Sequence, residues 1–442
     1  MILKKIIKYY NNGFIICLIF SSLIFQNSCK QNEFIPPEVG EKIPFENKSF
    51  KPLSQVIQES SANIFKTAWA KSNMNKILDS IGKDKTEFTL LIPSDQAFEK
   101  VGINLQKVNK MTSNSLDSLL LYHTIRNRLK DTNLKDRNDN LFVYSLLIEN
   151  KYFTRVRYLE IQPRNNSLYD YEKYYYRHAL KIDNKQLFVN GTEVGENKHV
   201  NTNIGSVFFI ERVIPRSAKT IIEVLETTPK FSLFLEALKY SDELYEHEYE
   251  KKNNGRKTNR NSFANRHLWK QNSSSVVLFQ TFFFPTNKAF EKAGFKTIED
   301  IKRFNQERFN PTWKLEYSRY NMVGQFPIDS LLDYHVSLGS YSNYPSLDWK
   351  YLGLINHLMI YSNLFLQEDF LQQAVYSRSA NTNYEEIMWP FRHRLNKDGK
   401  FLVGLSGSKQ MSIVDEPNIP SLMGPIHAMD DLIIPKNFKL KK

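Results

Sequence analysis

The sequence predicts an α+β fold that contains two tandem copies of one domain. Three blocks of residues each occur twice, in the same order, and internal repeats of this kind indicate a duplicated domain. The first block has the form of a buried strand that ends at a proline, followed by a Ser or Thr that can cap a short helix. The blocks are LLIPSDQAFEKVG at 90–102 and FFFPTNKAFEKAG at 282–294, DSLLLYHTI at 117–125 and DSLLDYHVS at 329–337, and the segments Gly205 to Pro215 and Gly424 to Pro435.

Length and composition indicate a globular protein with more than one domain. The chain has 442 residues, of which 41% are hydrophobic and 13% aromatic, which is enough to form ordinary cores. The formal net charge of +13 at pH 7 can attract anionic lipid headgroups, acidic polysaccharide or nucleic acid. We expect the basic, Asn-rich segment 251–275 to be a solvated loop, and its first twenty residues to be the first candidate for such a contact.

Residues 1–28 have the features of an export signal and not of a folded segment. Lys4, Lys5 and Lys8 precede an apolar stretch at 14–25 that is too short to span about 30 Å of hydrocarbon as a helix. Ser28 and Cys29 resemble the acylation site of a bacterial lipoprotein. Cys29 would then be the single cysteine of the mature chain, so that no internal disulfide could form. We expect a lipid on Cys29; an ordinary signal peptide that leaves a free thiol is the alternative.

Residues 29–52 are expected to form an acylated tether, because they carry paired prolines and mixed charge without helix or strand periodicity. The polar start at 30–33 faintly resembles signals that send some lipoproteins to the cell surface. The expected location is therefore the outer membrane, lipid-anchored, at the cell surface. The periplasmic face is the alternative.

The repeated blocks resemble the fasciclin-like domain in two copies. The shared pattern is an apolar strand, Pro, Ser or Thr, Asp or Asn and Ala-Phe, then Leu-x-Tyr-His, then a strand that starts at Gly and leads to Pro. Phe208 departs from it, because the family often has a His there, as the second copy does at His427. The resemblance implies two compact wedges of β-sheet packed with short α-helices, at 53–216 and 217–442, the second with insertions at about 241–275 and 341–395.

Two local patterns in the first copy predict particular elements. The helix expected at 116–125 places Leu116, Leu119, Leu120 and His123 on one face, so His123 should point inward. The sequence LFVNGTEV at 187–194 predicts two short strands joined by a turn at Asn190 and Gly191.

The common catalytic patterns are missing from the sequence. It contains no Gly-rich phosphate loop, no Gly-x-Ser-x-Gly nucleophile elbow and no His-Glu-x-x-His helix, and its nine histidines do not show metal-ligand spacing. GLSGS at 404–408 is not the elbow pattern. We therefore expect no enzyme activity, no cofactor and no metal site; a hydrolase site assembled by the insertions is an open alternative.

Two sets of residues are candidates for contact with a partner. The resemblance associates the Tyr-His position with adhesion in some members of the family, whereas the alternative is a His that is hydrogen-bonded inside a helix–sheet interface. Aromatic runs suit sugar rings or a protein partner, whereas the alternative is that they cover the sheets. The candidates are Tyr122, His123, Tyr334 and His335, then Tyr171, Tyr174, Tyr175, Tyr176 and Arg177, and in the second insertion Tyr341, Tyr344 and Trp349.

These features predict a non-catalytic, membrane-anchored lipoprotein that acts as a binding or adhesion module, as an accessory subunit of an outer-membrane complex for glycan or peptide uptake. The expected partners are the membrane, through Cys29, a protein of the outer membrane, and polysaccharide. Nucleic acid is not expected as a partner of an exported lipoprotein. The alternative is a purely structural subunit that braces an envelope transporter or secretion assembly.

Overall fold

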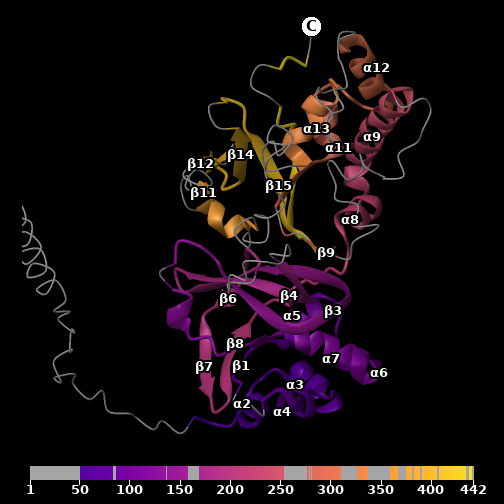
Figure 1. The fold of residues 1–442 in the computed structure, drawn as a ribbon. Helices are drawn as coiled ribbons and strands as arrows, with labels where there is room; N and C mark the ends of the chain where they lie inside the picture. Colours follow the sequence, from indigo (N-terminus) through magenta and orange to yellow (C-terminus); the bar gives the residue numbers. More distant parts are fainter. Residues whose placement is uncertain are drawn as a thin grey trace, which may run out of the picture. The chain divides into compact units, whose positions relative to one another are not determined.

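The computed structural model places Phe50–Lys442 in one compact unit. Both halves of this unit contain a β-sheet and a separate group of helices, which confirms the predicted α+β class (Figure 1). The residues that the structure describes are 50–82, 86–135, 137–157, 169–252, 276–277, 279, 281–309, 326–336, 359–366, 375–380, 383–388, 391–405, 408–434 and 438–440.

The first half begins with a layer of short helices. They are α2 (Leu53–Glu59), α3 (Asn63–Lys71), α4 (Met74–Gly82), α5 (Asp95–Lys100), α6 (Leu105–Lys110) and α7 (Ser113–Tyr122), followed by the 3-10 helix η1 (Asp131–Asn133). Their buried residues form one core cluster with Phe88, Leu90 and Ile92, alternate residues of a central strand. The helix layer therefore covers one face of the sheet, and Figure 1 shows α2, α3 and α4 near β1 and β8.

A nine-stranded sheet contains the eight strands of the first half and one short strand, β9, which comes from the second half of the sequence. Eight strands run in the order β6-β5-β4-β3-β2-β1-β8-β7, and β9 pairs with β3. Their bounds are β1 (Phe88–Pro93), β2 (Thr124–Arg126), β3 (Leu141–Arg157), β4 (Tyr169–Asp183), β5 (Gln186–Val189), β6 (Thr192–Glu196), β7 (Lys198–Thr202), β8 (Gly205–Ile210) and β9 (Val276–Val277). The predicted hairpin is present: β5 and β6 meet at Asn190 and Gly191, both with positive φ.

The second half contains a longer helix and two smaller sheets. Its helices are α8 (Ile221–Thr227), η2 (Pro229–Phe231), α9 (Ser232–Lys252), α11 (Asn287–Lys292), α12 (Ile298–Arg308), α13 (Asp329–Val336) and η6 (Ser362–Leu366). A five-stranded sheet has the order β10-β16-β15-β14-β13, and β11 pairs with β12. The strands are β10 (Phe282–Pro285), β11 (Val375–Ala380), β12 (Asn383–Met388), β13 (Phe391–Leu395), β14 (Phe401–Leu405), β15 (Ser412–Ser421) and β16 (Gly424–Met429).

One strand pairing recurs in both halves with the same register. The first strand pairs in parallel with the last strand of its half, β1 with β8 and β10 with β16. Pro93 lies opposite Ile210 and Pro285 lies opposite Met429, each five residues after the glycine that starts the last strand. The second half is therefore a structural repeat of the first, as the duplicated blocks predict.

The polar residues after each proline act as predicted and also have a second role. Ser94 and Thr286 accept hydrogen bonds from the backbone N–H of Ala97 and Ala289, which caps α5 and α11. The next residue, Asp95 or Asn287, reaches the start of an earlier helix instead, α3 or α9. Asp95 Oδ1 accepts from Ile64 N at 2.8 Å, and Asn287 Oδ1 accepts from Leu233 N at 3.1 Å. Each Pro-Ser/Thr-Asp/Asn block thus fixes two helices at the end of one strand.

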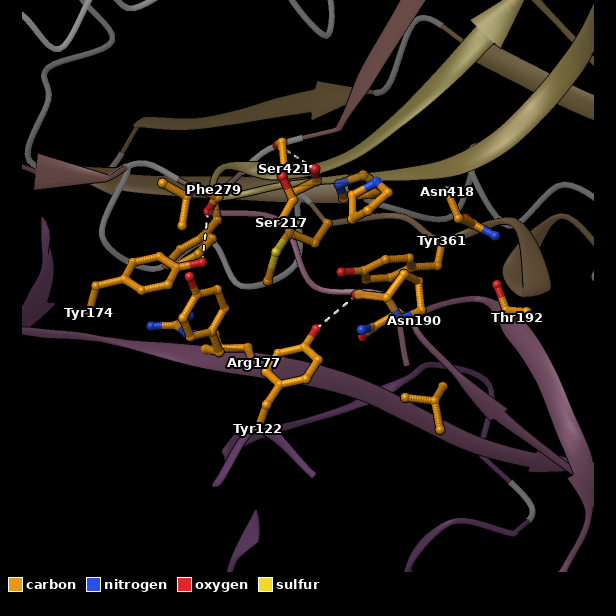
Figure 2. A pocket seen from close by; sticks show the side chains of 18 residues that line it. Tyr122, Tyr174, Arg177, Asn190, Thr192, Ser217, Phe279, Tyr361, Asn418 and Ser421 are labelled. Carbon is orange, nitrogen blue, oxygen red and sulfur yellow. Dashed lines mark hydrogen bonds between the residues drawn. The ribbon is translucent and has the colours of Figure 1, made fainter. Parts of the chain in front are cut away.

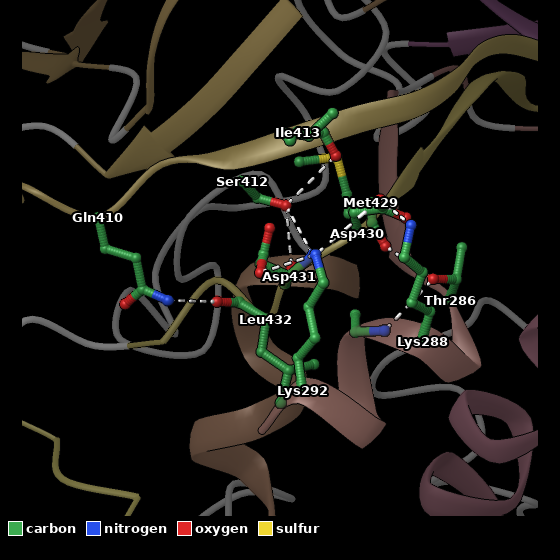
Figure 3. Close-up of polar contacts among 11 residues, drawn as sticks. Thr286, Lys288, Lys292, Gln410, Ser412, Ile413, Met429, Asp430, Asp431 and Leu432 are labelled. Atoms are coloured by element: carbon green, nitrogen blue, oxygen red, sulfur yellow. Dashed lines mark hydrogen bonds and ion pairs between the residues drawn. The ribbon is translucent and has the colours of Figure 1, made fainter. Parts of the chain in front are cut away.

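The residues after each last strand, which we call the exit segments (211–215 and 430–434), are held by side chains from elsewhere. In the second half Lys288 Nζ lies 2.7 Å from Asp430 Oδ2, and Lys292 Nζ lies 3.2 Å from Asp431 Oδ1 (Figure 3). Ser412 Oγ accepts from Asp431 N at 3.0 Å. These contacts fasten α11 and β15 to the same exit segment.

The two halves share one hydrophobic core. A single cluster of buried residues includes Leu91 and Phe208 from the first half and Phe282, Phe284 and Ile426 from the second. At roughly 25 cal/mol for each Å² of apolar surface removed from water, a continuous core strongly favours keeping the halves together.

We predict that Gly205→Ala strongly destabilises the protein. Gly205 has φ +154°, and a Cβ on it would lie 1.7 Å from the carbonyl oxygen of Phe88, so the parallel pairing of β1 with β8 would have to shift. We expect a loss of more than about 3 kcal/mol in the free energy of unfolding, measured by urea denaturation. The matched control is Gly102→Ala, which has φ +71° and no atom within 4 Å of the added Cβ. It should cost only about 1 kcal/mol, and equal losses in the two variants would contradict the prediction.

Candidate functional site

The first Tyr-His pair lies at the C-terminal end of α7 and is buried. His123 Nδ1 lies 2.9 Å from the carbonyl oxygen of Leu119, and His123 Nε2 accepts from the backbone N–H of Ile214 at 3.3 Å. The neutral ring therefore carries its proton on Nδ1. Tyr122 Oη donates to the carbonyl oxygen of Pro215 at 3.1 Å. Both side chains thus bind the exit segment of the first half.

The second pair repeats this arrangement at His335. His335 Nδ1 lies 2.6 Å from the carbonyl oxygen of Phe283, and Nε2 accepts from the backbone N–H of Ile433 at 2.8 Å. Ile214 and Ile433 lie at the same distance in sequence, nine residues, from Gly205 and Gly424. His123 and His335 therefore have the same structural role. Each ring forms hydrogen bonds both to a helix or strand and to an exit segment.

Two further buried histidines, His178 and His427, have the opposite tautomer and donate to backbone carbonyls through Nε2. His178 Nε2 donates to the carbonyl oxygen of Tyr122 at 2.7 Å, and His427 Nε2 donates to that of Ile360 at 2.9 Å. Burial lowers the pKa of all four rings from 6.5 to about 4, because a charged imidazolium would lose its hydration; the rings are His123, His178, His335 and His427. All four are neutral at pH 7.

An aromatic-lined cavity lies where the two halves meet (Figure 2). It brings together four residues that the sequence singled out with others that it did not. The lining residues are Tyr122, Tyr174, Tyr176, Arg177, Val189, Asn190, Thr192, Pro215, Ser217, Phe279, Met359, Tyr361, Asn418, Pro420, Ser421, Leu422, Gly424 and Pro425.

The walls of this cavity are fixed by hydrogen bonds between the halves. Tyr174 Oη donates to the carbonyl oxygen of Leu422 at 2.9 Å. A Cβ on Gly191, in the β5–β6 turn, would lie 2.7 Å from Tyr361 Cβ and 2.8 Å from the side-chain amide of Asn418. Asn418 in turn accepts from Ser362 N at 2.9 Å. The turn of the first half therefore lies directly against the second half.

Arg177 places a cation at the edge of the cavity. Its guanidinium carbon lies 4.1 Å from the centre of the Phe279 ring and 4.8 Å from that of Tyr144. Burial lowers the pKa of Arg177, and burial raises the pKa of Tyr174 well above its usual value. The arginine is held between aromatic faces, an arrangement that favours a cation in a partly desolvated place.

The volume of the cavity decides what it can hold. It encloses about 50 Å³, and one water needs roughly 10–15 Å³ on this scale. Pockets for small-molecule ligands measure about 300–1,000 Å³. The cavity has room for a few waters between tyrosine hydroxyls and amides but not for a sugar ring.

The structure places the remaining candidate residues as follows. Tyr176 is buried and its hydroxyl lies 3.5 Å from Glu149 Oε2; burial raises its pKa to about 12. Tyr175 is half-buried against Tyr144, with ring centres 6.0 Å apart. Tyr171 and Tyr334 lie in β4 and α13, where the structure does not describe their side chains. The predicted lipidation site Cys29 and the candidates Tyr341, Tyr344 and Trp349 lie outside the described residues.

Several of the Tyr-His residues and β4 tyrosines that were candidates for contact with a partner are buried. Tyr122, His123, Tyr174, Tyr176 and His335 are each exposed by 7% or less. Their hydrogen bonds are those of the alternative, a polar ring satisfied at a helix–sheet interface. A partner could reach these rings only if the halves or the exit segments moved.

Sequence reasoning missed Tyr361, Asn418 and Phe279, which complete the cavity. They lie outside the repeated blocks, and no motif marks them. Asn418 has φ +61°, a conformation that Asn tolerates better than most residues, but the sequence alone offers only the Pro-Asn pair at 417–418 as a signal.

Among the described residues, no group of three or more His, Cys, Asp or Glu side chains is arranged to hold a metal ion.

Comparison with known proteins gives one family match. Residues 60–216 match the family model described as Fasciclin domain. No curated protein matches the sequence. Among solved structures, the chain is similar to a FAS1 domain pair from the insect cell adhesion molecule fasciclin I, with 15% identity, a TM-score of 0.29, and coverage of 84% of this chain and 96% of that chain.

We predict that stability falls on acidification between about pH 6.5 and pH 4. His123, His178, His335 and His427 bind fewer protons in the folded state than in the unfolded state over this range, so protonation favours unfolding. Each ring contributes on the order of 3 kcal/mol, which together approaches the whole stability of a typical protein. Urea denaturation across this range should show a falling free energy of unfolding and acid unfolding above pH 4. A constant stability over the range would contradict the prediction.

We also predict that His335→Phe destabilises the second half. The variant fills the same space but leaves the N–H of Ile433 and the carbonyl of Phe283 buried without this partner, which should cost about 2–4 kcal/mol. It should also make the dependence of stability on pH shallower, because one titrating ring is lost. The control is His247→Phe, since His247 is exposed on α9. Both variants can be compared by thermal and urea unfolding, and a His335 variant as stable as the control would rule out the bridging role.

Proposed function

We propose that this protein is a non-catalytic binding and adhesion module tethered to a membrane. Fasciclin domains are in general non-catalytic adhesion and binding modules, and the match over residues 60–216 supports the same role here. The observation that carries the proposal is that the polar side chains of the repeated blocks form hydrogen bonds with the backbone. Ser94, Asp95 and His123, and their counterparts Thr286, Asn287 and His335, all bond to backbone groups.

Such bonding leaves these groups poorly suited to chemistry on a substrate. A nucleophile or general base has to reach a reacting atom with a free lone pair, and it usually works with a pKa near the operating pH. The ring nitrogens of His123 and His335 are occupied by backbone groups, and their pKa of about 4 lies far below neutral pH. The residues of the repeated motif therefore stabilise the fold, and we expect exposed residues elsewhere to bind the partner.

The proposed attachment is a lipid on Cys29 followed by the tether at 29–52. Within the part of the chain that the structure describes, no helix is long and apolar enough to cross a membrane. Several acyl chains would hold the protein at a bilayer, since each buried methylene contributes about 0.8 kcal/mol. We place the protein at the outer membrane, on the cell surface, as an accessory subunit of a complex that takes up glycans or peptides.

The shared core supports a module that presents both halves as one surface. Contacts such as that of Tyr174 with Leu422 hold the halves in one arrangement. A rigid pair of domains also suits the second candidate function, bracing a transporter or secretion assembly. The two functions predict different molecules bound to the isolated protein: glycan for a binding module, and a membrane protein for a bracing subunit.

We predict that Cys29→Ser moves the protein from the membrane fraction to the soluble fraction. The substitution removes the thiol that would carry the lipid, while the folded part of the chain is unchanged. Fractionation of cells that express each variant, followed by immunoblotting, measures the distribution. Cys17→Ser is the matched control, because Cys17 lies within the predicted export signal, and it should stay with the membrane. A Cys29→Ser protein that remains membrane-bound would contradict the lipid anchor.

A second experiment separates binding from bracing. The full-length protein is purified from native membranes in mild detergent, and external protease is applied to intact cells of the same culture. Glycan retained by the purified protein, with cleavage from outside, is expected for a surface binding module. A stoichiometric membrane protein without retained glycan would favour bracing. A turnover activity abolished by one substitution would overturn both functions.

A further inference from the structure

The β13–β14 hairpin carries a concentration of positive charge at an edge of the five-stranded sheet. Residues 391–410 contain five Lys or Arg and one Asp. We use the name basic hairpin for the surface formed by these five basic residues. They are Arg392, Arg394, Lys397, Lys400 and Lys409. In the described part of the sheet β13 is an end strand, with β14 as its neighbour.

The register of the hairpin separates an apolar face from a basic face. Phe391 lies opposite Leu405 and His393 opposite Val403, and Phe391, Val403 and Leu405 belong to a core cluster. Arg392 and Arg394 alternate with these residues, so they lie on the other face of the strand. The core therefore fixes the strand, and the arginines project away from it.

The segment after β14 adds its charge to the same face. Arg392 Nη2 donates to the carbonyl oxygen of Ser408, and a Cβ on Gly404 would lie 2.4 Å from the carbonyl oxygen of Gln410. Residues 408–410 thus lie over β14 beside Arg392, which places Lys409 next to the arginine. Charge from two parts of the chain is collected at one place.

The charge of the basic hairpin is not neutralised locally. Arg394, Lys397, Lys400 and Lys409 are exposed, and no ion pair joins them to a carboxylate among the described residues. The carboxylate of the turn, Asp398, is instead within 3.4 Å of the side-chain amide of Asn396. Elsewhere on the same half, lysines such as Lys288 and Lys292 do pair with aspartates.

We propose that the basic hairpin binds an acidic polysaccharide, an assignment that rests on the proposed binding function and names its partner. At about 3.3 Å per residue, Arg392 and Arg394 are spaced by roughly 7 Å along β13, and Lys397 and Lys400 lie beyond the end of this strand, so the charges are spread along the hairpin and one small anion cannot contact them all. A linear chain with a carboxylate or sulfate on successive sugars can meet them in turn. Arginine binds such groups through two parallel hydrogen bonds, and lysine adds point charge.

The hairpin is less suited to the other anionic surfaces. Peripheral binding to a bilayer depends on buried apolar area as well as charge, and Leu395, exposed by 43%, is the one large apolar side chain of β13 or β14 that is strongly exposed. Single-stranded nucleic acid usually stacks its bases on exposed aromatic rings. Phe401 packs instead against Phe365, with ring centres 5.5 Å apart.

The test is retention of the purified full-length chain, carrying Cys29→Ser, on immobilised polygalacturonate and dextran sulfate, with uncharged dextran as the blank. The variant R394E/K397E/K400E should lose affinity for the charged polymers by about tenfold or more, because attraction at three positions becomes repulsion. The affinity of the unchanged hairpin should also fall as NaCl is raised from about 0.05 M to about 0.5 M.

A matched control separates a site from general basicity. The variant K76E/K110E/K239E changes the net charge by the same amount at exposed lysines of α4, α6 and α9, and it should bind the polymers as the unchanged chain does. Circular dichroism and urea unfolding show whether each variant is folded, and single substitutions replace any triple variant that is not.

The outcomes distinguish this inference from the proposed function. Equal loss in both triple variants, or no loss in the hairpin variant, would overturn the hairpin site while leaving the membrane-tethered binding role to be judged by fractionation and native purification. Binding to vesicles of phosphatidylglycerol and phosphatidylethanolamine, without retention on either charged polymer, would replace the polysaccharide by a lipid surface and overturn the assignment.

Discussion

The parallel pairing of the first and last strands in each half is the constraint on which the rest of the structure depends. β1 with β8, and β10 with β16, keep one register, and the glycine that starts each last strand has positive φ. At Gly205 this allows the backbone to approach Phe88 more closely than a side chain would permit. His123 and His335 then fix the chain just beyond the pairing. The helix caps at Ser94 and Thr286 lie at the end of this pair.

The two halves share the same central strand pair but differ in the strands and helices added to it. The first half extends its sheet with the long strands β3 and β4, whereas the second uses short strands and a 21-residue helix, α9. Two lysine–aspartate pairs hold the second exit segment together with His335. In the first exit segment Glu211 and Arg212 stand in place of the two aspartates, and this segment is held by Tyr122, His123 and the ion pair of Glu211 with Lys198. Both halves therefore contain the same strand pair and the same histidine contact, whereas the elements around them differ.

Sequence reasoning reached the features that local chemistry determines. The strand before Pro93, the cap at Ser94, the turn at Asn190 and Gly191 and the inward position of His123 all follow from propensity, capping and periodicity, and the structure has each of them. The cavity could not be predicted, because Tyr361 and Asn418 reach it through packing between segments that are distant in sequence. The basic hairpin was missed for a different reason. Arg392 and Arg394 alternate with buried residues along β13, and Lys397, Lys400 and Lys409 come from the turn and from the segment after β14, so the five charges form one group only once the fold of the hairpin is known.

The separation in sequence of the paired strands has a consequence for how the protein forms. Thr89 and Ser206, whose hydroxyls lie 3.0 Å apart between β1 and β8, are 117 residues apart, and Thr286 reaches Met429 across 143 residues. Pairings between such distant residues form slowly, because a long loop must close before any contact is gained. During synthesis each first strand waits for nearly its whole domain before its partner emerges. In each half, therefore, the strand pairing that organises the domain is completed only after most of that half has been synthesised.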